Sequence, residues 1–326
     1  MLNDQIPRDR FLPLPDHGGC SSATRRTGVE IEFGGLSVDQ TAQIILDLWG
    51  GDVHERQERE ITLMGGVLGK VKVELDISLA KKWAEDMAAQ ALGDLVPVEI
   101  VTAPLSESQL PACEALLDAL HQQGGMGTQA KLGYGFGVHL NTEVPDAGTP
   151  AFMAIVRAFA VLEDWLRQSD PLDPARRLLP FVNPWPLALV DVLASRTDWQ
   201  LEDFAQSYAR LAPARGFGLD LLPALQDACP DALSDLPPDQ LKGGRPTFHY
   251  RLPETRLGDA QWSLAYEWNR WVLVEHVACD AKLMAALSEA WQTHRKKILS
   301  RRADFAQTVE SLLADAGSVA RMQDAG

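Results

Sequence analysis

Apolar and polar residues alternate along five short segments of the chain. In the first segment, Val29, Ile31 and Phe33 are apolar. The residues between them, Glu30 and Glu32, are acidic. Side chains at positions i and i+2 of a strand share a face, so this pattern predicts strands with one apolar and one polar face. The same alternation occurs in residues 71–76, 98–100, 137–141 and 247–252.

Other segments show the spacing of amphipathic helices. Helices are predicted over residues 37–49, 81–92, 106–123, most of 150–236 and, as one or two long helices, 259–315. Ser37 is the expected N-cap of the first helix. Strands are predicted over residues 26–33, 96–102, 133–143 and 247–252, with two or three short strands between 54 and 76. Hairpin-like spacing with few βαβ units favours an α+β fold around a mainly antiparallel sheet.

The same pattern suggests how the chain is divided. Residues 1–25 contain several prolines and glycines and are expected to form an irregular arm. Residues 26–326 are expected to form a single domain, with a helical insertion at 150–236 and C-terminal helices at 259–315.

The polar faces of the predicted strands are rich in ionisable groups: Glu30, Glu32, Glu74, Asp76, Glu99, His139, His249 and Arg251. Neighbouring carboxylates on one face repel each other unless a cation lies between them. Mg²⁺ takes oxygen ligands and usually binds through a few carboxylates together with substrate phosphates. Two interpretations stay open: an antiparallel sheet with one side in water, or an acidic surface that binds Mg²⁺ and a nucleotide.

Composition narrows the function classes. The chain has 326 residues, a net charge of −15 and a pI near 4.9, which disfavours nucleic acid as a partner. None of its four cysteines forms a Cys-x-x-Cys pair, so neither a zinc ribbon nor a redox motif is indicated. The N-terminus has no signal-peptide pattern, and no apolar run is long enough to span a membrane. We therefore expect a cytoplasmic protein.

Four motifs follow one another along the chain: Gly28-Val29-Glu30-Ile31-Glu32-Phe33, Asp76-Ile77-Ser78, Glu99-Ile100-Val101-Thr102-Ala103-Pro104-Leu105 and Gly137-Val138-His139-Leu140-Asn141. In this order and spacing they resemble the amidoligase family of the carboxylate–amine ligase superfamily, which is related to glutamine synthetase and glutamate–cysteine ligase. A Phe-Arg strand of the family resembles Tyr250-Arg251. The resemblance covers about residues 26–280.

The resemblance implies a glutamine synthetase-like catalytic fold, with a curved antiparallel sheet of about six strands and helices packed on its convex side. It also implies amide or peptide bond formation driven by ATP through an acyl phosphate, with two or more Mg²⁺ ions. The expected metal ligands are Glu30, Glu32, Glu99 and His139.

Further roles follow from the same motif match. Arg251 is expected to face the transferring phosphoryl group, while Asp76 and Ser78 are expected to orient the metal or the substrate. The chain departs from the family at His249, which replaces a carboxylate expected to bind metal. Because imidazole suits Mg²⁺ poorly, the metal count and the activity stay open.

One loop and one glutamate are further candidates. Lys242 and Arg245 flank two glycines and are candidates for binding ATP phosphates or a substrate carboxylate; a solvated loop is the alternative. Glu74 shares a face with Asp76, but no motif includes it.

Three function classes are compatible with these observations. The first is a ligase acting on small-molecule or peptide carboxylates and amines, with no nucleic-acid or membrane partner and with homo-oligomerisation left open. The second is an ATP-dependent phosphotransferase on a related sheet, and the third a nucleotide- or ligand-binding protein without activity. Release of ADP that requires both a carboxylate and an amine distinguishes the first from the others.

Overall fold

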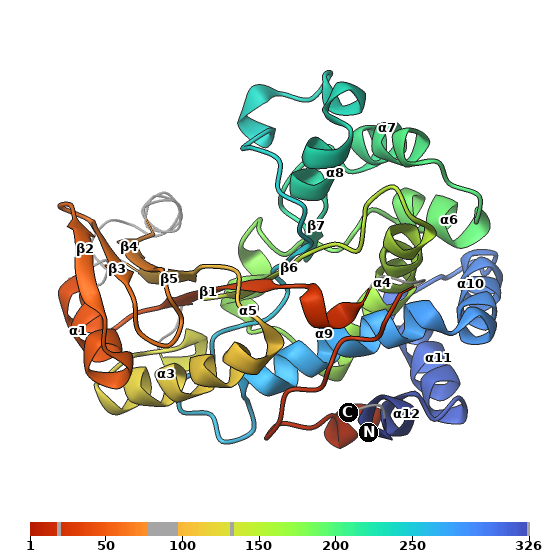
Figure 1. Cartoon of the computed structure of the whole chain (residues 1–326). Coiled ribbons are helices and arrows are strands. Elements are labelled where there is room, and N and C mark those ends of the chain that lie inside the picture. Colours follow the sequence, from red (N-terminus) through yellow and green to blue (C-terminus); the bar gives the residue numbers. More distant parts are fainter. Residues whose placement is uncertain (18–20, 77–96, 131–133, 325–326) are drawn as a thin grey trace.

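A single open sheet organises the molecule (Figure 1). The computed structural model describes residues 1–17, 21–76, 97–130 and 134–324. Within these ranges the strand order is β2-β3-β4-β5-β1-β6-β8-β7, and all neighbouring strands are antiparallel. The strands are β1 (Thr27–Phe33), β2 (Asp52–Arg56), β3 (Glu60–Met64), β4 (Val71–Leu75), β5 (Val98–Thr102), β6 (Val138–Thr142), β7 (Leu219–Asp220) and β8 (His249–Tyr250).

The mixed helix-and-sheet class is confirmed, whereas the expectation of about six strands is wrong. The described residues form eight strands. One of the additional strands, β7, lies within residues 150–236, a stretch predicted to be mostly helical. A strand of two residues cannot show a period-two pattern. Its place in the sheet is set by antiparallel pairing with β8 and not by local sequence.

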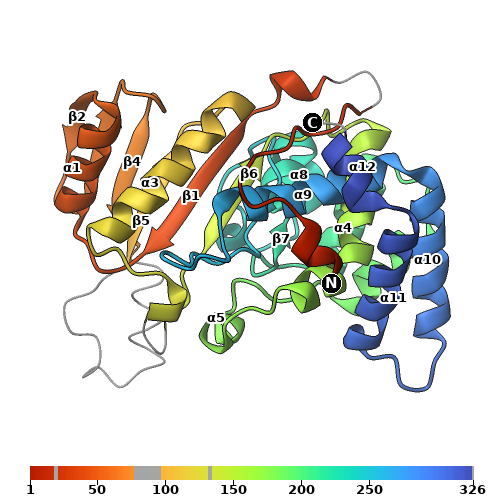
Figure 2. The same ribbon diagram turned by 90° about the horizontal axis from the view of Figure 1, so that it is seen from below.

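Three helices cover one face of the sheet: α1 (Val38–Trp49), α3 (Leu110–Gln122) and α9 (Leu264–Cys279). Seen from below, they lie in front of the strands (Figure 2). Helix α1 begins where the sequence predicts, because the Ser37 side chain accepts a hydrogen bond from the backbone N–H of Gln40.

The apolar side chains of the strands form the core beneath these helices. All three apolar residues of β1, Val29, Ile31 and Phe33, are fully buried. At the far side of the sheet, the Tyr250 ring lies 5.3 Å from the ring of Trp271 on α9, measured between centroids. Because polar residues alternate with these core residues, the same register presents the polar residues on the opposite face.

The remaining described α-helices are α4 (Pro150–Ser169), α5 (Pro174–Leu178), α6 (Leu187–Ser195), α7 (Leu201–Leu211), α8 (Leu222–Ala228), α10 (Ala281–Arg295), α11 (Arg302–Asp315) and α12 (Ser318–Asp324). The expectation of one or two long helices over 259–315 is wrong, since three separate helices form there. Asp280 separates the first two: it follows the last residue of α9, and its side chain accepts the backbone N–H of Leu283 in α10. Because the Asp280 side chain caps the start of α10, two helices form here instead of one continuous helix.

The N-terminal arm packs on α9. The side-chain amide of Asn269 donates hydrogen bonds to the carbonyls of Pro7 and Arg10, and its oxygen accepts from the N–H of Leu12. The arm also contributes buried apolar side chains: Leu2, Ile6, Leu12 and Leu14.

Some predictions fall outside the described residues: the helix over 81–92, the start of the strand predicted from residue 96, and Ser78. The division into an arm, one catalytic domain and a helical insertion stays a prediction. Among the described residues, no helix has both the length and the apolar character needed to cross a membrane.

Candidate active site

Four glutamates, one from each of four neighbouring strands, form a row across the polar face of the sheet. The strand register places each opposite the next: Glu60 (β3), Glu74 (β4), Glu99 (β5) and Glu32 (β1). Lys72 neutralises the outer part of this glutamate row, with its Nζ 2.6 Å from Glu74 Oε1 and 3.8 Å from Glu60 Oε2. The inner part contains Glu99 and Glu32 and lies at the centre of the sheet.

Glu99 differs from its neighbours in the row, because no described residue pairs directly with its carboxylate. Burial raises its pKa well above the usual value, and the negative charges of Glu30 and Glu32 raise it further. Within the described ranges, no hydrogen bond or ion pair to its carboxylate is present. A partly buried carboxylate among other negative charges is destabilising unless it is protonated or a cation binds to it.

Glu32 is held in place by its neighbours. Its Oε2 accepts a hydrogen bond of 2.7 Å from the backbone N–H of Gly137, and its Oε1 lies 3.5 Å from His139 Nε2. The buried guanidinium of Arg176 lies 3.9 Å from Oε2. A Cβ atom at position 137 would lie 2.4 Å from an Arg176 nitrogen, so the glycine of the Gly-x-His-x-Asn motif is needed for this close packing.

Glu30 is bound by two residues of β6. His139 Nδ1 lies 2.6 Å from Glu30 Oε2, and Asn141 Nδ2 donates a hydrogen bond of 2.9 Å to Oε1. Burial acts to raise the pKa of Glu30, but the hydrogen bond and the charge of His139 outweigh burial and hold that pKa far below its usual value. Glu30 is therefore a carboxylate anion at neutral pH.

His249 and Arg251 extend this cluster towards β8. His249 Nδ1 is hydrogen bonded to Asn141 Oδ1, and its Nε2 lies 2.9 Å from Arg251 Nη2. Arg251 Nη1 donates to the backbone carbonyl of Arg215 at 2.7 Å. Burial, and next the charge of Arg251, lower the pKa of His249 well below its usual value, so the imidazole is neutral.

Among the residues that the structure describes, two groups of side chains have donor atoms close enough together for a metal ion. The ligand atoms of Glu32, Glu99 and His139 lie within 4.8 Å of one another, and so do those of Glu30, His139 and His249. The first group supplies two carboxylates, the ligand type that Mg²⁺ prefers. A divalent cation at that position would relieve the repulsion that raises the pKa of Glu99. The sheet thus brings together all four predicted metal ligands.

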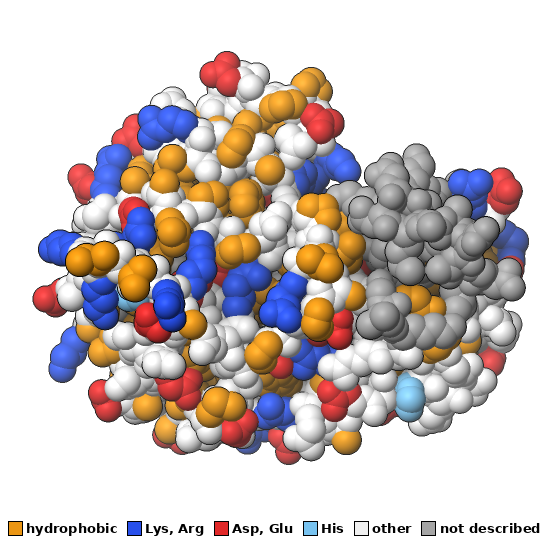
Figure 3. All heavy atoms as spheres, turned by 180° about the vertical axis from the view of Figure 1, so that it is seen from behind, with side chains coloured by type: hydrophobic (Ala, Val, Ile, Leu, Met, Phe, Trp, Pro, Cys, Tyr) orange, Lys and Arg blue, Asp and Glu red, His pale blue; other side chains and the backbone are white. Residues whose placement is uncertain are grey.

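A large cavity adjoins this cluster. Its volume is about 1090 Å³, and it is lined by Glu30, His249 and four cationic residues: Arg215, Lys242, Arg245 and Arg251. The loop singled out in the sequence, Lys242 to Arg245, therefore lies at the candidate site. Lys and Arg side chains also gather across the middle of the face seen from behind (Figure 3), although the whole chain is acidic.

Of the other predicted site residues, the structure describes some and not others. Asp76 directly follows β4, and its charge contributes to the raised pKa of Glu99, after burial, Glu30 and Glu32. Ser78 lies outside the described residues. Glu74 belongs to the glutamate row but is paired with Lys72.

Sequence reasoning did not single out three residues of this site. Asn141 is the last residue of a motif, but no role was assigned to it. Arg176 follows the start of α5, and Arg215 lies in the loop before β7. Both arginines lie in the stretch predicted to be mostly helical, where single cationic residues carry no readable pattern.

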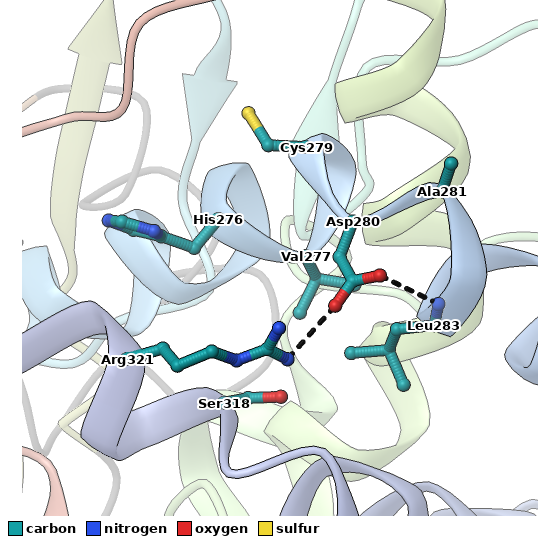
Figure 4. Close-up of a pocket in the computed structure, with 8 residues that line it drawn as sticks. All are labelled: His276, Val277, Cys279, Asp280, Ala281, Leu283, Ser318 and Arg321. Carbon is teal, nitrogen blue, oxygen red and sulfur yellow. Dashed lines mark hydrogen bonds and ion pairs between the residues drawn. The ribbon is translucent and has the colours of Figure 1, made fainter.

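A second, smaller cavity of about 320 Å³ lies where α9 meets α10 and α12 (Figure 4). An ion pair of 2.9 Å between Arg321 and Asp280 lies within it. The side chain of Cys279 points away from this pair. None of the predicted site residues lines this cavity, whereas four of them line the large cavity on the polar face, which is therefore the candidate active site.

The comparison with protein families agrees with the motifs. Residues 23–273, more than half of the chain, match the model of the family described as "putative amidoligase enzyme". The chain therefore belongs to the amidoligase family, which indicates an enzyme of the ligase type. A comparison with curated proteins found no match.

Proposed function

We propose that the protein is an ATP- and Mg²⁺-dependent carboxylate–amine ligase that forms an amide or peptide bond through an acyl phosphate. The observation that carries this proposal is the juxtaposition of two features on one face of the sheet. One is the carboxylate set of Glu30, Glu32 and Glu99 beside His139. The other is the cation-lined cavity next to it. Cations for phosphates beside carboxylates for Mg²⁺ suit a metal–nucleotide complex.

Glu30, Glu32, Glu99 and His139 are the residues that would hold the metal ions. Bound Mg²⁺ would neutralise phosphate oxygens and polarise the transferring phosphoryl group. The protein keeps Glu32 oriented through the N–H of Gly137, and Glu30 through Asn141. Both carboxylates are thus positioned before any ligand arrives, which lowers the cost of ordering them on binding.

Arg251 is the residue proposed to stabilise charge on the phosphoryl group. Two of its nitrogens have protein partners, whereas the buried Nε has none among the described residues. Arg251 lines the large cavity, so its guanidinium charge lies beside any anionic ligand that binds there. Lys242 and Arg245, on the same cavity, are proposed to bind ATP phosphates.

In the proposed reaction, an oxygen of the substrate carboxylate attacks the γ-phosphorus of ATP, and ADP leaves. An amine then attacks the acyl carbon, and phosphate leaves with formation of the amide bond. Asp76 and Ser78 are proposed to orient the metal or the substrate. Small-molecule and peptide substrates both fit a cavity of about 1090 Å³.

A thermal-shift titration with Mg²⁺ and ATP tests the nucleotide site. A ligand at 100 times its dissociation constant stabilises by about 2.7 kcal/mol, which corresponds to a rise of several degrees. We expect a rise that requires both Mg²⁺ and nucleotide and that is lost in Glu32→Gln. The matched control is Glu74→Gln, which changes the same row at a carboxylate already paired with Lys72 and is expected to keep the rise.

Turnover separates the ligase from its alternatives. Release of ADP that depends on both a carboxylate and an amine supports the proposal. Release of ADP without an amine, with a stable phosphorylated product, would indicate a phosphotransferase. Nucleotide binding without turnover of any carboxylate and amine pair would indicate a binding protein.

A further inference from the structure

His249 is the residue of the site whose role the sequence leaves open, because an imidazole can bind metal or form hydrogen bonds. In the structure both ring nitrogens have protein partners. Nδ1 is hydrogen bonded to Asn141 Oδ1, and Nε2 lies 2.9 Å from Arg251 Nη2. The side chain is buried, with 4 % of the residue's surface exposed.

The chemistry of the partners determines the direction of each hydrogen bond. A guanidinium only donates, so Nε2 of His249 is an acceptor. A neutral imidazole then carries its proton on Nδ1, which donates to Asn141 Oδ1. The Asn141 amide in turn donates from Nδ2 to Glu30 Oε1 at 2.9 Å. Every bond in this relay of Arg251, His249, Asn141 and Glu30 therefore points the same way.

A neutral imidazole has one in-plane lone pair, and in His249 that lone pair accepts from Arg251. None is left for a metal ion. Although the donor atoms of Glu30, His139 and His249 lie within 4.8 Å of one another, binding of a metal by His249 would require loss of the Arg251 hydrogen bond. It would also place the ion next to a guanidinium, which is unfavourable.

We infer that His249 is a positioning residue that orients Arg251 towards the cavity, and that the metal ligands of this face are Glu30, Glu32, Glu99 and His139 without His249. The functional consequence rests on the proposed function, since Arg251 is assigned there to the phosphoryl group. The hydrogen-bond relay itself does not depend on that function.

The hydrogen-bond relay keeps Arg251 and Glu30 from pairing directly with each other. Arg251 and Glu30 carry opposite charges and attract each other across the cluster. His249 and the carbonyl of Arg215 hold the guanidinium at two nitrogens. Asn141 meanwhile occupies one oxygen of Glu30. Direct pairing of Arg251 with Glu30 would neutralise both groups, whereas the relay keeps the cation available for an anionic ligand and the carboxylate for a metal.

Nitrogen-15 NMR of the histidine rings tests the relay in the ligand-free protein, with the His249 signals assigned by their loss in His249→Gln. We expect His249 to show a protonated Nδ1 and an unprotonated Nε2 from pH 6 to 8, and no change on titration with Mg²⁺. His139 is expected to respond to Mg²⁺. A proton on Nε2 of His249, or a Mg²⁺ response of His249 as large as that of His139, would overturn the inference.

Binding of ADP, used with Mg²⁺ as the probe, tests the role in positioning. A lost hydrogen bond to a charged group weakens binding by about 10-fold or more. We expect this loss in both His249→Leu and Arg251→Gln. Glutamine at position 249 retains one donor and one acceptor, so His249→Gln is expected to recover most of the affinity. Equal loss in His249→Gln and His249→Leu contradicts positioning through hydrogen bonds.

The two measurements keep this inference separate from the proposed function. If the wild type binds no ADP while His249 shows the expected tautomer, the proposed function fails and the relay stands. If the wild type binds ADP and His249 responds to Mg²⁺ as a ligand does, the relay fails and the proposed function stands.

Discussion

Replacing Glu99 with glutamine is expected to stabilise the metal-free protein. Glu99 lies in a row of four glutamates, and burial together with the charges of Glu30 and Glu32 raises its pKa well above the usual value of 4.5. The ionised form therefore opposes folding at neutral pH. Glutamine has a similar shape without the charge, so Glu99→Gln removes the repulsion.

The size of the effect follows from linkage between protonation and folding. Each unit by which the folded pKa exceeds the unfolded pKa corresponds to about 1.4 kcal/mol at a pH above both values. We expect Glu99→Gln to gain about 1–3 kcal/mol at neutral pH, a rise in Tm of roughly 2 °C for each kcal/mol in a chain of this size.

The pH dependence has a definite sign. The folded pKa of Glu99 is raised, so the contribution of Glu99 to stability is most favourable below the unfolded value of about 4.5 and becomes less favourable as the pH rises from there through the folded pKa. The variant is expected to lack this change. Saturating Mg²⁺ is expected to reverse the order, because the wild type gains a metal ligand that glutamine replaces poorly.

Differential scanning calorimetry from pH 4 to 8, with chelator and with Mg²⁺, measures all three effects. The control is Glu74→Gln, the neighbour in the same row, whose ion pair with Lys72 makes the change neutral or slightly destabilising. A Glu99→Gln variant that is less stable than the wild type in chelator, or that keeps the wild-type pH dependence, refutes the reasoning.

Three further predictions concern other parts of the molecule. Asn269→Ala removes the side chain that binds the N-terminal arm and is expected to cost about 1–3 kcal/mol by urea unfolding; a change under 0.5 kcal/mol contradicts this role. Burial acts to lower the pKa of His17, but hydrogen bonds with Cys279 and Glu275 raise that pKa to about 9. The stability that protonated His17 contributes is therefore complete below about pH 6.5 and is lost as the pH rises through about 9. Measurements of Tm should show that His17→Gln abolishes this loss. Iodoacetamide is expected to label the exposed Cys279 in the folded protein, whereas burial raises the pKa of Cys113 to about 12 and of Cys229 to about 11; mass spectrometry showing faster labelling of either buried thiol would contradict this.

Much of the fold and of the site could be predicted from patterns among residues close in sequence. Alternation in β1 predicts that Glu30 and Glu32 share the polar face, and the register with β5 and β6 places Glu99 and His139 beside them. The capping residue Ser37 is equally local, since its side chain bonds to a residue three positions later. Such features depend on residues close in sequence, where period and capping rules apply.

Features that depend on distant pairing were not predictable in the same way. The glutamate row is a product of register between β3, β4, β5 and β1, which no single segment encodes. Arg176 and Arg215 reach the site from loops and a short helix in the stretch 150–236, where tertiary contacts and not periodicity decide their place. The role of His249 depends on its hydrogen bond to Asn141, which is 108 residues away in the sequence, as well as on the nearby Arg251.

Trapping of the acyl phosphate tests the central claim most directly. Hydroxylamine is a small amine that attacks acyl phosphates, so a ligase of this kind should convert a carboxylate, ATP and hydroxylamine to a hydroxamate, ADP and phosphate. The assay uses the full chain with Mg²⁺, a panel of amino acids and short peptides as carboxylates, and Glu32→Gln as the inactive comparison. The account predicts hydroxamate and ADP in equal amounts from the wild type and neither from the variant. Release of ADP without hydroxamate, or equal yields from the wild type and the variant, would contradict it.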